Sequence, residues 1–167
     1  MGRLYWITGL AGAGKSSLGC KLYENLKPQN PALVYLDGDC LREVFDVNGQ
    51  YEEIQRHQIS MKYARLCHLL TTQGIDVICA TISMFDDVRA WNRENISNYT
   101  EIYLEVSFPV LEKRNQHELY SGHSGDHIKN VVGCDIHAQL PTNPDIVLRN
   151  DGDDTIDELA QRLLELI

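Results

Sequence analysis

Residues 4–26 read LYWITGLAGAGKSSLGCKLYENL, in which an apolar run, a glycine-rich turn and a helical pattern follow one another directly. The turn fits the pattern G-x-x-x-x-G-K-[ST] at every fixed position. Glycines let backbone N–H groups converge on phosphate oxygens, and the start of the following helix adds a partial positive charge. The pattern therefore predicts a loop that binds a nucleoside triphosphate. The residues expected to hold the triphosphate are Gly9, Leu10, Ala11, Gly12, Ala13, Gly14, Lys15, Ser16 and Ser17.

Two polar side chains of this loop have predicted roles in phosphoryl transfer. Lys15 is expected to reach the β- and γ-phosphates of ATP, and the Ser16 hydroxyl is expected to bind Mg²⁺. The chain contains neither an Asn/Thr-Lys-x-Asp motif for guanine nor a Leu-Ser-Gly-Gly transporter signature. These absences argue against a GTPase switch and a transporter ATPase, and favour a small-molecule kinase.

Short apolar runs alternate with longer amphipathic runs along the whole chain. Strands are predicted at residues 4–8, 32–36, 75–80, 101–106 and 145–148, and helices at 15–26, 52–73, 88–95, 109–116 and 155–166. This alternation predicts an α/β protein with the three-layer fold of P-loop NTPases: a five-stranded parallel sheet with helices on both faces. We expect one domain over residues 1–167. Residues 117–144 follow neither period, so we interpret them as a functional lid segment.

Charge and composition restrict the classes of partner. The 167 residues include 15 Lys and Arg against 24 Asp and Glu, a net charge of −9. This balance argues against a nucleic-acid polymer or an anionic membrane surface as partner. No apolar run reaches the ~20 residues that span a bilayer. Without a signal peptide, and with five cysteines lacking C-x-x-C spacing, the chain is expected to be cytoplasmic. Arg89 and Arg93 are interpreted as solvated helix charges.

An acidic pair follows the second predicted strand, in the run Leu36-Asp37-Gly38-Asp39. Both carboxylates are expected at the carboxyl edge of the sheet, where open α/β sheets bind ligands. One carboxylate can hold a water on Mg²⁺, while the other accepts the proton of an acceptor hydroxyl. A solvated Asp-Gly turn without a catalytic role is the alternative interpretation.

Further short matches extend over most of the chain. They are Arg42, Ile82-Ser83, Arg114, Leu119-Tyr120, Ile128-Lys129-Asn130, Gly133 and Asn143-Pro144-Asp145-Ile146-Val147-Leu148. Together with the phosphate loop and the acidic pair, these segments resemble the adenylylsulfate kinases. The resemblance implies transfer of the γ-phosphoryl group of MgATP to the 3′-hydroxyl of adenosine 5′-phosphosulfate. It also implies a homodimer.

The resemblance assigns roles position by position. Asp39 would be the base toward the acceptor hydroxyl, and Asp37 would hold a metal-bound water. Arg42 would contact the acceptor phosphate, and Ser83, at the position of a serine once proposed as a phosphorylated intermediate, is interpreted as a substrate-contacting hydroxyl. Arg114 would lie near the ATP base. The remaining expected acceptor contacts are Tyr51, Gln55, Arg56, Gln58, Ile82, Phe85 and Lys129.

The departures from the family pattern gather around the acceptor. The family has Asn, Phe, Arg, Asn, Arg and Phe where this chain has Cys40, Gln50, Gln55, Gln58, Asp86 and Val131. Tyr51 is a candidate replacement for one lost aromatic ring, and Arg56 for the lost arginine. Stacking on an aromatic ring contributes ~1–3 kcal/mol per base, so loss of both rings would weaken binding of adenine.

Three functions remain open at this point. The first is an adenylylsulfate kinase with an atypical acceptor pocket. The second is a kinase for the 3′-hydroxyl of another nucleotide, such as cytidine diphosphoramidate. The third is a regulatory module that binds a nucleoside triphosphate without transferring phosphate.

Overall fold

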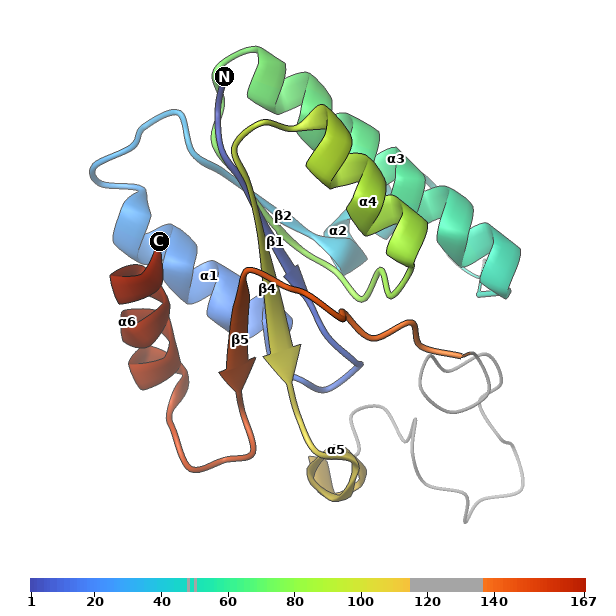
Figure 1. The fold of residues 1–167 in the computed structure, drawn as a ribbon, viewed down its shortest axis with the longest axis vertical. Helices are drawn as coiled ribbons and strands as arrows, with labels where there is room; N and C mark the ends of the chain where they lie inside the picture. Colours follow the sequence, from blue (N-terminus) through green and yellow to red (C-terminus); the bar gives the residue numbers. More distant parts are fainter. Residues whose placement is uncertain (48, 50, 115–136) are drawn as a thin grey trace.

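A five-stranded parallel sheet forms the centre of the molecule (Figure 1). The computed structural model describes the whole chain except residues 48, 50 and 115–136. The strand order is β2-β3-β1-β4-β5, and every neighbouring pair is parallel. This confirms the predicted sheet. The strands are β1 (Leu4–Thr8), β2 (Val34–Asp37), β3 (Val77–Ala80), β4 (Tyr99–Glu105) and β5 (Ile146–Arg149).

Helices cover both faces of the sheet and complete the three predicted layers. Helices α1 and α6 pack on one face, and α3 and α4 pack on the other (Figure 1). All predicted bounds of strands and helices agree with the structure within two residues. The helices are α1 (Lys15–Leu26), α2 (Gly38–Val44), α3 (Glu53–Thr72), α4 (Asp86–Asn95), α5 (Phe108–Arg114) and α6 (Ile156–Leu166).

The central strand β1 is buried along its whole length. Leu4 and Trp6 belong to the apolar cluster under α3 and α4, whereas Tyr5 and Ile7 belong to the cluster under α1 and α6. Side chains alternate between the two faces of a strand, so a strand covered on both faces is apolar at every position. The buried strand fixes the place at which the phosphate loop leaves the sheet.

The parallel arrangement brings three connecting segments to one edge of the sheet. The phosphate loop follows β1, Gly38 follows β2, and the segment from Thr81 to Phe85 follows β3. Because β2, β3 and β1 are neighbours, their carboxyl ends lie side by side at this edge. The topology thus places the candidate site residues of all three segments together.

Helix α2 was not expected from the sequence. The Asp37 carboxylate accepts a hydrogen bond from the Asp39 backbone N–H at 2.9 Å and so caps this seven-residue helix. The Asp37-Gly38 step is therefore the start of a helix rather than a turn, with Asp37 half-buried and Asp39 exposed. Of the expected lid, residues 137–144 are described and contain neither helix nor strand, while the remainder lies outside the described residues.

None of the helices in the described part of the chain combines the length and the apolar character needed to cross a bilayer.

Candidate active site

The phosphate loop turns sharply between β1 and α1. Gly14 lies in the left-handed region at φ 96°, and a Cβ atom there would lie 2.8 Å from the Asn150 side-chain nitrogen. Both constraints require glycine at this position. The Lys15 ammonium donates to the Leu10 carbonyl oxygen at 2.7 Å, so its side chain folds back over the loop. The predicted phosphate-binding residues thus form a tight turn between β1 and the start of α1.

Two side chains from distant parts of the sequence support the back of this loop. The Asn150 amide, at the end of β5, donates to the Ala13 carbonyl at 2.8 Å. Arg114 of α5 donates to the Gly12 carbonyl at 3.3 Å and to the Asn150 carbonyl at 2.7 Å. Arg114 was expected near the ATP base, and it lies against the phosphate loop. Asn150 was not expected from the sequence, although its place after the last strand of a parallel sheet was a usable signal.

Lys15 stands beside the two carboxylates of the acidic pair. Burial lowers the pKa of Lys15 to about 8, and the carboxylates of Asp39 and Asp37 act in the opposite direction. Desolvation disfavours a charged ammonium, whereas a nearby anion favours it. The lysine therefore keeps most of its positive charge at neutral pH and can meet the phosphates of a nucleotide.

Tyr35 connects the phosphate loop to Asp37. Its hydroxyl lies 3.0 Å from the Ser16 carbonyl oxygen and 3.0 Å from a carboxylate oxygen of Asp37. Burial, followed by the negative charge of Asp37, raises the pKa of Tyr35 well above its usual value, so the hydroxyl keeps its proton. A Cβ at Gly19 would lie 2.7 Å from the Tyr35 ring, so glycine leaves room for this tyrosine.

The residues at this edge fit a magnesium ion. Ser16 offers an exposed hydroxyl group, and Asp37 offers carboxylate oxygens with free lone pairs. Mg²⁺ prefers hard oxygen ligands and is held by one or two carboxylates together with substrate phosphates. Among the described residues no cluster of three or more His, Cys, Asp or Glu side chains could hold a metal by itself. A phosphate-bridged ion suits this donor set.

A pocket open to solvent lies beside the acidic pair. Its lining combines residues from the segments after β2 and β3 with residues of α3. Asp39 is its acidic side chain, and Tyr63 and Phe85 add aromatic rings. The predicted acceptor residues that line it are Asp39, Arg42, Arg56, Ile82, Ser83 and Phe85.

Tyr51 stands outside the lining and holds the two arginines of the pocket. The guanidinium of Arg42 lies 5.0 Å from the centre of the Tyr51 ring, and that of Arg56 lies 5.3 Å from it. The Arg56 side chain also donates to the Tyr51 carbonyl at 2.8 Å. Burial, followed by the positive charge of Arg42, lowers the pKa of Arg56. Two cations thus face one pocket, which suits an anionic acceptor.

Two predicted acceptor contacts lie elsewhere. The Gln55 side chain accepts from the Glu52 backbone N–H at 3.3 Å and forms part of the capping box of α3. Gln58 is exposed and does not line the pocket. A helical turn offers one side chain to the pocket at this level, and Arg56 takes that place. Arg56 therefore lines the pocket and Gln55 and Gln58 do not, and which of the three contacts the acceptor stays a prediction.

Ser83 combines burial with an unusual backbone conformation. The residue is 4% exposed and has φ 28°, in the left-handed region that non-glycine residues rarely adopt. Its hydroxyl has no hydrogen-bond partner among the described residues, although it lines the pocket. Buried polar groups usually have a partner, so a hydroxyl of this kind is suited to bind a ligand.

The remaining departures from the family pattern have different outcomes. Cys40 is exposed on α2 and is not among the pocket residues. Asp86 forms an ion pair with Arg89, whose side chain is only 5% exposed. The interpretation of Arg89 as a solvated charge is wrong, because Glu101 of β4 and Asp86 draw it under α4. Predictions for Gln50, Lys129 and Val131 concern positions outside the described residues.

Known proteins resemble this chain over most of its length. The family model described as adenylylsulphate kinase matches residues 1–149. The chain belongs to the adenylylsulfate kinase family. The sequence is 38% identical over 162 residues to the cytidine diphosphoramidate kinase of Campylobacter jejuni, covering 97% of this chain and 94% of that protein. It is 32% identical to the adenylyl-sulfate kinase of Deinococcus deserti, covering 97% and 90%.

Solved structures of family members have the same fold. The APS kinase of Mycobacterium tuberculosis, determined with AMPPNP and APS, superposes with a TM-score of 0.86. The two sequences are 29% identical, and the match covers 99% of this chain and 96% of the other. As a member of this kinase family, the chain is an ATP-dependent phosphotransferase with an alcohol acceptor. The regulatory module without transfer activity is thereby set aside.

Proposed function

We propose that this family member phosphorylates the 3′-hydroxyl of cytidine diphosphoramidate. The observation that carries the proposal is the altered acceptor pocket, in which Arg56 supplies the second cation while Gln55 caps a helix. The higher identity to the Campylobacter jejuni enzyme, 38% against 32% for the adenylyl-sulfate kinase of Deinococcus deserti, supports the same acceptor. A pyrimidine is smaller than adenine and needs less aromatic surface than the family pattern provides.

The donor side acts through position and charge. The loop from Gly9 to Ser17 binds the triphosphate with backbone N–H groups, and Lys15 neutralises charge on the β- and γ-phosphates. Mg²⁺, held by the Ser16 hydroxyl and through water by Asp37, would supply further charge neutralisation when bound. Arg114 and Asn150 keep the loop in place through its carbonyl groups. These contacts would fix the γ-phosphorus for in-line attack.

The acceptor side supplies the proton transfer. Asp39 lines the pocket in the first turn of α2 and would accept the proton of the attacking hydroxyl. As that oxygen bonds to the γ-phosphorus, the bond to the β,γ-bridging oxygen breaks, and ADP leaves with the electron pair. Arg42 and Arg56 would bind the anionic groups of the acceptor. The unpartnered Ser83 hydroxyl would hydrogen-bond to the acceptor and orient it.

Adenosine 5′-phosphosulfate is the second candidate acceptor. The family match and the fold shared with the complex containing APS favour it. Arg42 and Ser83 stand at the family's acceptor positions, and Phe85 retains an aromatic ring in the pocket lining. Both candidates carry a nucleoside, an anionic bridge and a ribose hydroxyl, so the same catalytic groups serve either one.

An acceptor panel tests the proposal. Purified protein is incubated with MgATP and, separately, cytidine diphosphoramidate, adenosine 5′-phosphosulfate or CMP as matched control. ADP release gives the rate, and product mass with fragmentation locates the new phosphoryl group. We expect the highest kcat/KM with cytidine diphosphoramidate. A higher value with adenosine 5′-phosphosulfate would overturn the proposed acceptor and make the altered pocket a tolerated variant.

The expected homodimer and cytoplasmic location stay predictions. Light scattering of the purified chain, with and without nucleotide, measures the first. Fractionation of cells that produce the chain measures the second.

A further inference from the structure

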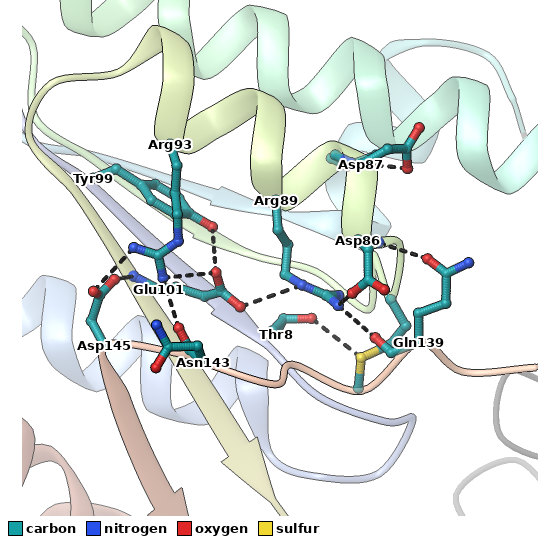
Figure 2. A network of polar contacts seen from close by, with 12 residues as sticks. Thr8, Asp86, Asp87, Arg89, Arg93, Tyr99, Glu101, Gln139, Asn143 and Asp145 are labelled. Atoms are coloured by element: carbon teal, nitrogen blue, oxygen red, sulfur yellow. Dashed lines mark hydrogen bonds and ion pairs between the residues drawn. The ribbon is translucent and has the colours of Figure 1, made fainter.

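Arg89 joins three separate parts of the molecule beneath α4 (Figure 2). Its Nε atom lies 3.3 Å from a carboxylate oxygen of Glu101 on β4. Its Nη2 atom donates to the Asp86 carboxylate and, at 2.7 Å, to the main-chain oxygen of Gln139. One buried guanidinium therefore connects the sheet, the start of α4 and the segment that leads to β5.

Gln139 forms hydrogen bonds with the segment that follows β3. Its backbone N–H donates to the Met84 carbonyl at 3.2 Å, and its side-chain oxygen accepts from the Asp86 backbone N–H at 2.6 Å. Figure 2 shows Gln139 directly beside Asp86 and Arg89. Because Arg89 holds the carbonyl of the same glutamine, the guanidinium determines where Gln139 can bind.

We define this segment, residues 82–86, as the acceptor loop. It carries Ser83 and Phe85, both in the pocket lining. On its other side the Thr8 hydroxyl donates to the Ile82 carbonyl at 2.5 Å. The left-handed conformation of Ser83 has no glycine to favour it, so the surrounding contacts must maintain it. Arg89 and Gln139 provide those contacts on one side, and Thr8 provides them on the other.

The charges around Glu101 indicate that Arg89 does more than neutralise a carboxylate. Glu101 has a side chain 4% exposed, and Arg93 already lies 3.1 Å from its second oxygen. Burial raises the pKa of Glu101, and the two arginines act in the opposite direction. Arg93 continues to Asp145, away from the acceptor loop, whereas the Nη2 contacts of Arg89 go to Asp86 and Gln139.

We propose that Arg89 is a positioning residue for the acceptor. It acts through Asp86 and Gln139 to hold the acceptor loop in the conformation that presents Ser83 and Phe85. The inference rests on the proposed function only in taking this pocket as the acceptor site. It does not depend on which nucleotide occupies the pocket.

The test compares Arg89→Lys with Arg93→Lys. Each lysine retains a positive charge beside Glu101, but a lysine has no planar fork to reach Asp86 and Gln139 together. We expect Arg89→Lys to raise the KM of the acceptor by about tenfold or more while the KM of ATP is unchanged. Arg93→Lys should lower Tm to a similar degree and leave the acceptor KM within about twofold. Equal acceptor KM values for both variants would overturn the proposal.

Hydrogen exchange supplies a readout that needs no turnover. The Asp86 backbone N–H should exchange faster in Arg89→Lys than in the wild type and in Arg93→Lys. If the wild type phosphorylates neither candidate acceptor, the proposed acceptors fail, and the exchange rates alone decide on Arg89. Should Arg89→Lys not fold, Gln139→Ala removes the acceptor of that N–H without breaking an ion pair. An unchanged Asp86 exchange rate in Gln139→Ala would also contradict the proposal.

Discussion

The donor side and the acceptor side of the site are built from different kinds of atoms. On the donor side, Lys15, Arg114 and Asn150 all bind carbonyl oxygens of the phosphate loop, so side chains serve to shape a main-chain surface. On the acceptor side, most of the residues that line the pocket carry large or polar side chains, such as Arg56 and Phe85. A main-chain surface survives most substitutions, whereas a side-chain surface changes with each one.

This difference bears on the departures from the family pattern, which the sequence led us to expect around the acceptor. Arg56 lines the pocket and Gln55 does not, since successive helical residues point about 100° apart. The phosphate loop tolerates no shift of one position, since Gly14 is limited both by its φ and by Asn150. The comparison leads to four predictions, which differ in which side of the site they change.

Asp39→Asn should have the largest effect, because Asp39 is proposed to act where the acceptor hydroxyl attacks the γ-phosphate. An amide cannot accept the hydroxyl proton, so kcat should fall by roughly 10²–10⁴-fold while ATP still binds. Stopped-time product assays and nucleotide titration measure the two quantities. The matched control is Cys40→Ser, an exposed neighbour that should retain turnover. Turnover by Asp39→Asn at the wild-type rate would refute the base assignment.

Arg56→Gln tests the acceptor side alone. Loss of a charge-assisted hydrogen bond of about 1.5–3 kcal/mol should raise the acceptor KM by roughly 10–100-fold. ATP binding should be unchanged. The neighbouring variant Gln55→Ala should instead lower the free energy of unfolding by about 0.5–2 kcal/mol, since it removes a helix cap, and should keep the acceptor KM. A raised acceptor KM in Gln55→Ala, together with an unchanged acceptor KM in Arg56→Gln, would show that Gln55 and not Arg56 contacts the acceptor.

The pH dependence of ATP affinity tests the donor side. Burial lowers the pKa of Lys15 to about 8, so the free enzyme loses this proton between neutral and alkaline pH. Bound phosphates require the charged form, and therefore the Kd of ATP should rise about tenfold between about pH 7 and about pH 9. Calorimetric titration at fixed free Mg²⁺ measures the change. Lys15→Gln should bind weakly at both pH values, and a wild-type Kd that is constant over this range would contradict the assignment.

Asn150→Ala should have the smallest effect on catalysis. It leaves the Ala13 carbonyl without its donor, which should lower the free energy of unfolding by about 1–3 kcal/mol and Tm by a few degrees. The KM of ATP should rise by roughly fivefold, since the loop remains but is less firmly held. Thermal melts and ATP kinetics test both effects, with exposed Asp153→Ala as the matched control. A larger change in the KM of the acceptor than in the KM of ATP would contradict the assignment of Asn150 to the donor side.

The sequence predicted most of what depends on local pattern. The strands alternate with amphipathic helices, and the phosphate loop follows a fixed motif, so both were accessible. Helix α2 was not, because seven residues beginning with Gly38 carry too little periodicity and the cap comes from Asp37 itself. The burial of Arg89 could not be predicted either, because it depends on Glu101. That residue becomes its neighbour only once β4 is in place.

The capping of α3 lies between these cases. The helix was expected from residue 52, and its Glu52–Gln55 box could have been found by counting three residues from that start. The count would have assigned the Gln55 side chain to the start of α3. Ser83 could not be predicted in this way. Its left-handed conformation is imposed by surrounding contacts, and a serine gives no sign of that conformation in the sequence.

The order of strands has a consequence for folding during synthesis. Strands β1 and β2 both pair with β3, and neither pairs with the other. A ribosome that adds ~5–20 residues per second therefore releases the first two strands seconds before their shared neighbour exists. The phosphate loop precedes β3 in the chain, and the sheet beside it cannot begin to assemble until Val77–Ala80 has emerged. Pairing of β1 and β2 in the sheet therefore depends on a strand about 40 residues further along the chain than β2.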